Sequence, residues 1–117
     1  MKEEMNPFLP LAPAALHILL ALAGEDLHGY GIMLEVARQS NQQYKLGPGT
    51  LYDNLKKLMG LGAVEEVRKR FAGGDPRRRY YRLTALGRRV LAAEVARLET
   101  VVRDAKGYLL GAKPRRA

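Results

Sequence analysis

The chain has 117 residues, of which 47% are hydrophobic, and this fits one compact domain. Twenty Lys and Arg against 12 Asp and Glu give a formal net charge of +8, which favours a polyanionic partner. The sequence has no Cys, which excludes disulfides, thiolate zinc sites and cysteine nucleophiles, and it fits a reducing cytoplasm, where we expect the protein to act. A chain this short buries a modest fraction of its surface, so a second copy is an expected source of stability.

An apolar stretch near the start of the chain predicts a buried helix and no membrane segment. It covers residues 8–23, is too short to span a bilayer, and is interrupted by Pro10 and Pro13. Its Ala- and Leu-rich part, residues 14–23, is apolar nearly all round, which is typical of a helix at the centre of a small domain. His17 is expected to be a packed core histidine, with a ligand role as the alternative.

A second helix is predicted after a short break. Ile32, Met33 and Val36 lie at helical spacing and predict a helix over residues 29–39. A polar connection follows, and the Gly-Pro-Gly segment at residues 47–49 marks the start of the next helix.

The third helix has one apolar stripe. Leu51, Leu55 and Leu58 fall at i, i+4 and i+7, so they share a buried side and leave a polar and basic face outward. Gly60 is expected to end this helix.

Two short strands are predicted next. Residues 63–69 and 79–83 are expected to pair across the Gly-Gly-Asp-Pro turn at residues 73–76. Tyr80 and Tyr81 are neighbours on the second strand, so one is expected to pack inward while the other faces outward.

A run of basic residues covers this hairpin. Residues 68–82 contain seven Lys and Arg but one acidic residue. Positive charge clustered in this way favours a surface that binds nucleic acid, and the alternative is an ordinary solvated face.

The last predicted element is a long helix over residues 84–110, with Thr84 as a good N-cap. Apolar residues recur along it at spacings of four, three, four, three and four, the pattern of a helix–helix seam. A helix of this length extends past a small domain, so we expect part of the seam to meet a second copy; the alternative packs it all within one chain. The seam consists of Leu91, Val95, Leu98, Val102, Ala105 and Leu109.

The order of elements is helix, helix, turn, helix, basic hairpin and long helix, which is the winged helix-turn-helix layout. The expected fold class is therefore mostly α with a small β-hairpin. In this layout the helix after the turn enters the major groove of DNA, while the hairpin contacts flanking backbone or minor groove. The expected parts are an N-terminal arm (1–13), the winged helix-turn-helix domain (14–83), a C-terminal dimerisation helix (84–110) and a basic tail (111–117).

Three segments carry a resemblance to a known family: LHGYGI at residues 27–32, GPGTLY at residues 47–52, and RYYRLT at residues 79–84. In this order and at these separations they make the chain resemble the PadR-like family of transcriptional regulators over about residues 16–91. The resemblance implies a homodimer that represses transcription from a two-fold-related operator on double-stranded DNA. The smaller family members dimerise through a single C-terminal helix and often respond to small aromatic compounds at the dimer interface, so such an effector is a further possible partner.

The resemblance also implies which residues contact DNA. The start of the recognition helix offers N–H groups and a positive dipole end to a phosphate, and its hydroxyl, amide and ammonium groups suit phosphates and base edges. The alternative for Tyr52 is a half-buried packing role. The wing cations would anchor phosphates. His28, Gly29 and Tyr30 would fix the entry to the second helix, with a ligand role as the alternative. The expected recognition-helix residues are Pro48, Gly49, Thr50, Tyr52, Asp53, Asn54, Lys56 and Lys57, and the wing residues are Arg68, Lys69, Arg70, Arg77, Arg78 and Arg79.

The chain is not expected to be an enzyme or to hold a metal or cofactor. With no Cys and only two His, the sequence offers no set of groups that could share nucleophile, base and orienting roles. Two further hypotheses stay open: a sequence-neutral nucleic-acid binder, and an interaction module with the same fold. Preference for one duplex over random competitor tests the first. Loss of DNA binding with intact dimerisation, on charge reversal at residues 77–79, would argue against the second.

Overall fold

The computed structural model describes residues 8–68 and 78–111, and its element order confirms the winged helix-turn-helix layout. All four predicted helices are present, with ends within a residue or two of those expected. The elements in chain order are α2 (Pro13–Gly24), β1 (Leu27–His28), α3 (Gly29–Gln39), α4 (Pro48–Gly60), β2 (Val64–Val67), β3 (Tyr80–Leu83) and α5 (Ala85–Leu109).

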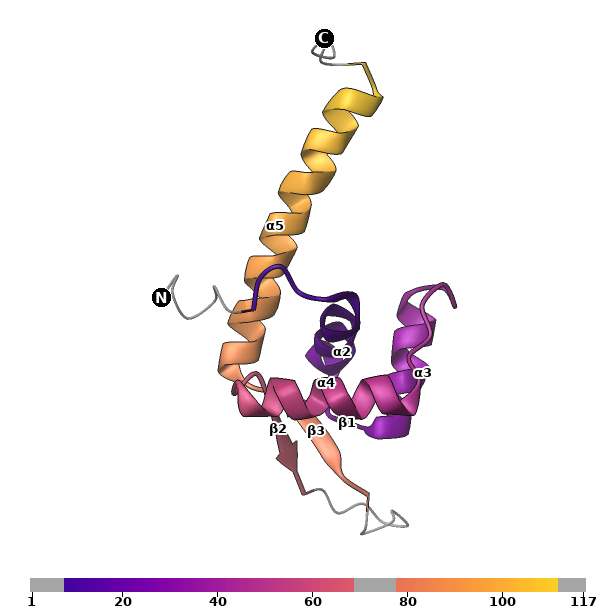
Figure 1. Ribbon diagram of the computed structural model, residues 1–117, viewed down its shortest axis with the longest axis vertical. Coiled ribbons are helices and arrows are strands. Elements are labelled where there is room, and N and C mark those ends of the chain that lie inside the picture. Colours follow the sequence, from indigo (N-terminus) through magenta and orange to yellow (C-terminus); the bar gives the residue numbers. More distant parts are fainter. Residues whose placement is uncertain (1–7, 69–77, 112–117) are drawn as a thin grey trace.

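Helix α2 lies at the centre of the molecule, between α3 and α5, with α4 crossing at one end (Figure 1). Ile18, Leu19 and Leu22 are buried on this helix, as its nearly continuous apolar surface predicts. His17 stacks on Tyr44, with ring centroids 4.5 Å apart and an interplanar angle of 15°. The prediction of a packed histidine is therefore confirmed.

The sheet has three strands in the order β1–β3–β2, all antiparallel. The sequence predicts only the β2–β3 pair, and the structure adds β1, in which Leu27 pairs with Tyr81 and His28 with Tyr80. A strand of two residues is too short to show the alternation by which strands are recognised. Tyr81 is buried and Tyr80 is only partly so, which confirms that the two tyrosines face opposite sides of the sheet.

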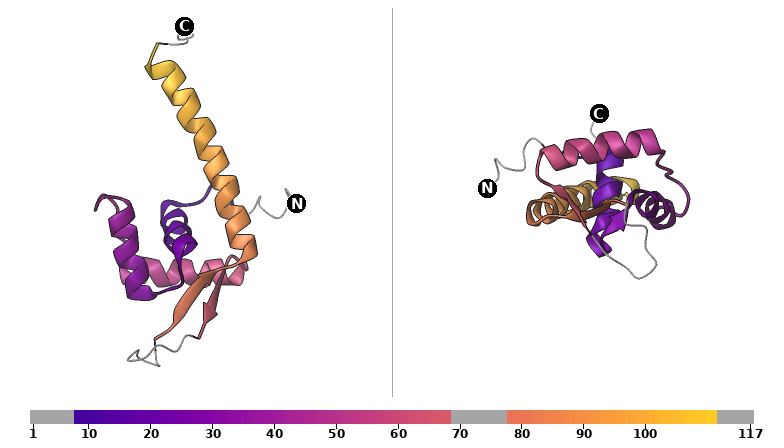
Figure 2. Two further views of the ribbon diagram at one scale, coloured as in Figure 1. Left: turned by 180° about the vertical axis from the view of Figure 1, so that it is seen from behind. Right: turned by 90° about the horizontal axis from the view of Figure 1, so that it is seen from below.

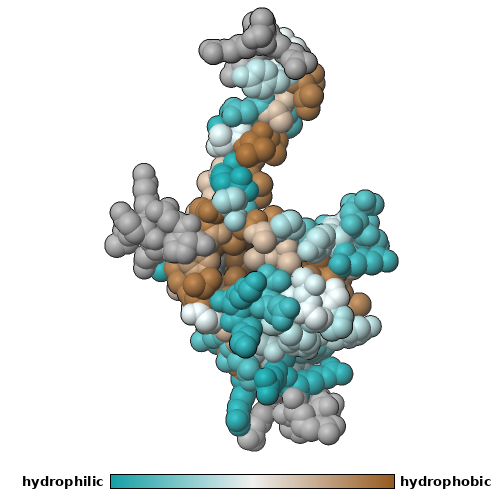
Figure 3. Space-filling model, viewed as in Figure 1, coloured by the Kyte–Doolittle hydropathy of each residue, from teal (hydrophilic) through white to brown (hydrophobic). Residues whose placement is uncertain are grey.

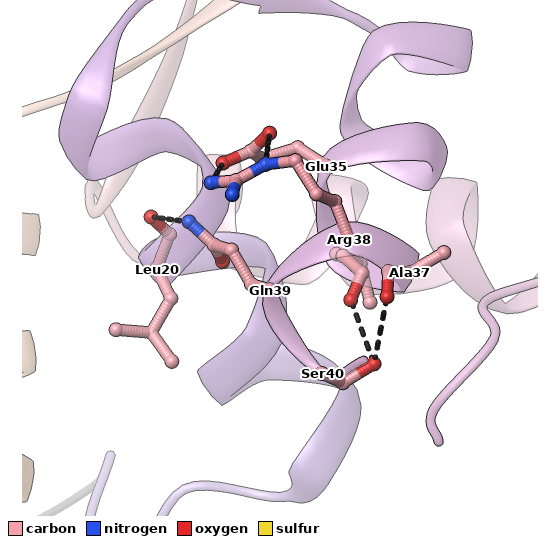
Figure 4. Close-up of polar contacts among 7 residues, drawn as sticks. Leu20, Glu35, Ala37, Arg38, Gln39 and Ser40 are labelled. Atoms are coloured by element: carbon pink, nitrogen blue, oxygen red, sulfur yellow. Dashed lines mark hydrogen bonds and ion pairs between the residues drawn. The ribbon is translucent and has the colours of Figure 1, made fainter. Parts of the chain in front are cut away.

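Polar side chains near the end of α3 form hydrogen bonds within this helix and one to α2. The Ser40 hydroxyl donates to the Val36 and Ala37 carbonyls, and the Gln39 side chain donates to the carbonyl of Leu20, 3.3 Å away on α2 (Figure 4). The Ser40 hydroxyl also accepts from the Tyr44 N–H at 3.0 Å, which ties the connection before α4 to the end of α3.

Helix α5 is buried at its base and leaves the rest of the molecule beyond it (Figures 1 and 2). Val90, Leu91 and Glu94 are its last buried residues, and the molecule measures 62 Å along its longest axis. Leu91 therefore belongs to the core of its own chain, and the exposed part of the predicted seam starts at Val95. Within residues 8–68 and 78–111, none of the helices combines the length and apolar content needed to cross a bilayer.

Candidate nucleic-acid interface

One side of α4 is buried and the other is open to solvent, as the leucine stripe predicts. Leu51 and Leu55 are fully buried and Leu58 nearly so. The predicted recognition residues all lie on α4, and most are exposed: Pro48, Gly49, Thr50, Tyr52, Asp53, Lys56 and Lys57, with Asn54 partly buried. The structure thus brings the whole predicted set together on one helix.

The first turn of α4 carries backbone donors that suit an anion. Gly47 is the N-cap and forms no side-chain cap hydrogen bond among the described residues, and Pro48 occupies the first helical position. The N–H groups of Gly49 and Thr50 precede the first intrahelical donor, Leu51, which donates to the Gly47 carbonyl at 2.9 Å. A phosphate oxygen at this end would meet these donors and the positive end of the helix dipole.

Asn54, one of the predicted recognition residues, has a side chain that is already hydrogen-bonded. Its Nδ2 donates to the Thr50 carbonyl at 2.8 Å, one turn back on the same helix. To read an adenine edge, this amide would have to give up that contact.

The wing lies beside α4, at the end of the molecule opposite the tip of α5 (Figure 1). Arg68 follows β2, while Arg78 and Arg79 precede β3, and all three are exposed. Arg79 lies 3.9 Å from Glu66 on the paired strand. The predicted wing residues Lys69, Arg70 and Arg77 lie outside the described residues.

One arginine of the basic run, Arg82, is paired with a carboxylate. Arg82 on β3 donates to the Asp26 carboxylate at 3.0 Å, and this contact raises the pKa of Arg82. It therefore joins β3 to the segment before β1, and contributes less to the positive field than its position in the run implies.

An open pocket of about 520 Å³ lies between α4, the start of α3 and the wing. Tyr52 lines it from α4, His28 and Gly29 line it from the start of α3, and Arg78 and Arg79 line it from the wing. Tyr52 is half exposed, and its hydroxyl lies over Gly29, so a packing role and a DNA-facing role are both compatible with its position.

His28 is the N-cap of α3, which confirms its predicted role at the entry to this helix. Its Nδ1 accepts a hydrogen bond from the Gly31 N–H at 3.0 Å, and its ring meets Tyr80 edge-on. Burial, and to a lesser degree the charge of Arg78, lowers the pKa of His28. The pairing of this ring with the wing was not predicted, because residues 28 and 78 are linked only through the unexpected strand β1.

A second exposed surface lies along α5. Its apolar members extend from the base of the helix to its tip, and brown residues mark them in Figure 3. The seam residues beyond Leu91 are exposed or partly exposed (Val95, Leu98, Val102, Ala105 and Leu109), and Val101 and Tyr108 widen this surface.

Glu94 is a buried charge that no sequence pattern singles out. Its side chain is 1% exposed on α5 and accepts from Arg97 at 2.6 Å and from the Leu11 N–H at 3.2 Å. These hydrogen bonds, that of Arg97 foremost, lower the pKa of Glu94 against the opposing effect of burial. No group of three or more potential metal-binding side chains is present in the part of the chain that the structure describes.

Comparison with known proteins matches residues 18–93 to the family model described as "Transcriptional regulator PadR-like family". The transcriptional regulator Rv3488 of Mycobacterium tuberculosis is 33% identical over 96 residues, covering 82% of this chain and 85% of the relative.

Solved structures share the fold. A PadR family transcription regulator from Clostridium difficile superposes with a TM-score of 0.67 and 25% identity, covering 84% of this chain and 99% of that one. A transcriptional regulator from Clostridium thermocellum has a TM-score of 0.70 and 19% identity, over 92% and 96% of the two chains. Bacillus subtilis PadR, solved in complex with operator DNA, has a TM-score of 0.62 and 23% identity, over 74% of this chain and 48% of that one.

Proposed function

Because the chain belongs to the PadR-like family of DNA-binding transcriptional regulators, we propose that it is a repressor that binds a two-fold-related operator as a homodimer. The observation that carries this proposal is the position of the exposed face of α4 beside the basic start of β3. A helix of this kind fits the major groove while the wing reaches the flanking backbone. The operator-bound structure of Bacillus subtilis PadR, which has the same fold, supports the arrangement.

The homodimer part of the proposal is supported by the exposed apolar surface of α5. Val102 and Leu109 are 49% and 83% exposed, and such residues rarely line a free helix over several turns. Two copies packed through this surface would present two α4 helices on one side of the dimer. In a two-fold dimer these helices would enter major grooves about 34 Å apart, one helical turn of DNA.

We further propose that a small aromatic effector releases the protein from its operator. The apolar surface where α5 meets the central part of the chain supports this proposal (Figure 3). A small aromatic compound bound there between two copies would change how α5 packs. If saturating concentrations of such compounds leave operator affinity unchanged, the protein is a repressor without this kind of sensor.

The first experiment is a titration of the protein against duplex DNA from upstream of its own coding sequence, with random-sequence competitor, at two salt concentrations. Selective and salt-sensitive binding, with two protomers per duplex, is the expected result. Equal binding to the competitor would instead identify a sequence-neutral nucleic-acid binder. A reporter gene behind the same DNA then decides the sign of regulation, because a repressor lowers expression and an activator raises it.

A matched pair of variants links this result to α4. Lys56→Gln removes one positive charge from the exposed face of α4, and Lys106→Gln removes the same charge near the tip of α5. We expect the first to weaken DNA binding and the second to leave it unchanged. Equal effects would point to general attraction by the net charge of the chain.

A further inference from the structure

The pocket between α4 and the wing contains two nitrogen atoms whose contact is chemically unsatisfied. Nη1 of Arg78 lies 3.1 Å from Nε2 of His28. Nδ1 of His28 accepts the hydrogen bond from Gly31, so Nδ1 carries no proton. In neutral imidazole the single proton must then be on Nε2.

This proton assignment makes both partners donors. A guanidinium nitrogen can only donate, and Nε2–H also donates, so the close approach of Arg78 and His28 cannot be a hydrogen bond. Protonation of the ring would not remove the conflict, since it would add a second positive charge beside Arg78 and would take away the acceptor that caps α3. An acceptor atom beside this pair, within hydrogen-bond distance of both nitrogens, would satisfy both donors.

The other sides of the pocket favour an anionic oxygen as that acceptor. Arg79 adds a second guanidinium, whose Nε lies 3.9 Å from the Glu66 carboxylate, and Tyr52 adds a hydroxyl; Arg79 is exposed and Tyr52 half exposed. Among the described residues that line the pocket, none is acidic. Guanidinium and imidazole N–H groups bind phosphate oxygens through charge-assisted hydrogen bonds.

The position of the pocket favours a phosphate of the DNA backbone over a free phosphate ion. It is bordered by α4 on one side and by the wing on the other. If α4 lies in a major groove and the wing reaches the flanking minor groove, the strand of phosphates that separates the two grooves runs between them. We propose that the pocket holds a backbone phosphate of duplex DNA, one oxygen of which accepts hydrogen bonds from both Nε2–H of His28 and the guanidinium of Arg78. This inference rests on the proposed DNA-binding function.

In this proposal His28 caps α3 through Nδ1 and donates to the phosphate through Nε2–H. Different substitutions separate these two roles. His28→Asn keeps a side-chain oxygen that can cap α3 but removes the donor that faces Arg78. His28→Ala removes both. Arg78→Gln removes the cation from an exposed position, and Arg103→Gln, on the distal part of α5, is the matched control for loss of charge.

The test measures binding of a fluorescent duplex by anisotropy for these variants. We expect His28→Asn to weaken binding about threefold to tenfold and Arg78→Gln about tenfold. The loss of affinity in the double variant should be smaller than the product of the two single losses, because both side chains act on one phosphate. Arg78→Gln should also reduce the slope of log affinity against log salt concentration by about one, the change expected when one phosphate contact is lost. Arg103→Gln should bind as the native protein does.

A second arm separates the possible sources of the anion. The ring signals of His28 are followed by NMR during titration with the duplex and, separately, with inorganic phosphate. A shift of the Nε2–H signal on adding the duplex, lost in Arg78→Gln, supports the proposal. Response to inorganic phosphate alone, with unchanged duplex affinity for His28→Asn, would overturn it in favour of a free-anion site.

The outcomes also separate this inference from the proposed function. If the native protein binds no duplex, the DNA-binding function itself fails. If it binds, and His28→Asn and Arg78→Gln both bind within twofold of the Arg103→Gln control, the function stands and the phosphate position is wrong. Should His28→Asn fail to fold, the exposed Arg78→Gln variant alone decides the matter.

Discussion

The hydroxyl of Tyr52 on α4 rests against the backbone of Gly29 at the start of α3, so closely that a Cβ added to Gly29 would overlap it. A side chain at position 29 would therefore have to displace the tyrosine, so the absence of one lets this side chain on the proposed DNA-facing helix lie against α3.

Gly29→Ala should displace Tyr52 while leaving the fold intact. The clash is with the far end of a half-exposed side chain, which can swing away, so we expect a loss of unfolding free energy below about 1 kcal/mol. Duplex affinity should fall about tenfold, because the displaced ring no longer lines the pocket. Gly60→Ala is the control, since nothing lies within 4 Å of its added Cβ. Unchanged affinity for Gly29→Ala would show that the position of Tyr52 does not matter for binding.

Gly87→Ala should destabilise the junction between the wing and α5. A Cβ at this position would overlap the carbonyl oxygen of Ala63, a backbone atom that already accepts from the Thr84 N–H. We expect a loss of about 2–3 kcal/mol in chemical denaturation, as for overpacked cores. Gly107→Ala, in the exposed part of the same helix, should instead stabilise by up to about 1 kcal/mol through helix propensity.

Val102→Asp tests the proposed dimer. A charge in the centre of the α5 surface would have to be buried on association, so the variant should be monomeric at concentrations where the native protein is dimeric. Thr100→Asp is the matched control, because two residues at about 100° each place it on the far side of the helix. Sedimentation equilibrium distinguishes the two. A dimeric Val102→Asp variant would rule out this surface as the interface.

Glu94 should stabilise the fold in a pH-dependent way. Because its pKa is lowered in the folded state, its contribution is complete above the ordinary glutamate range and is lost as the pH falls through the folded pKa. Glu94→Gln should cost about 1–3 kcal/mol at neutral pH, and the difference from the native protein should shrink on acidification. Glu99→Gln, exposed on the same helix, should unfold as the native protein does at every pH. A gap that persists at low pH would show that packing, and not charge, explains the loss.

The helices could be predicted because each carries a periodic apolar pattern. The leucine stripe of α4 indicates both its extent and its exposed face, and with that face the positions of the proposed recognition residues. The seam of α5 indicates its length, and the family motifs indicate the chain order of helix, wing and helix.

The missed features depend on contacts between distant parts of the chain. Strand β1 exists because its two residues pair with β3, about 50 positions later, and its own composition carries no strand signal. His28 meets Arg78 for the same reason. Glu94 is buried because the segment before α2 folds over it, and a glutamate on a helix otherwise predicts an exposed position.

Thr84 is the single residue between β3 and α5, and it leaves no hinge between them. Its hydroxyl donates to the Gly62 carbonyl at 2.6 Å and accepts from the Gly87 N–H at 3.0 Å, so the junction is held from both sides. These contacts couple the direction of β3 to that of α5. A change in the angle between two packed α5 helices would therefore be transmitted to β3, which directly precedes α5, and with it to the wing arginines Arg78 and Arg79 that precede this strand.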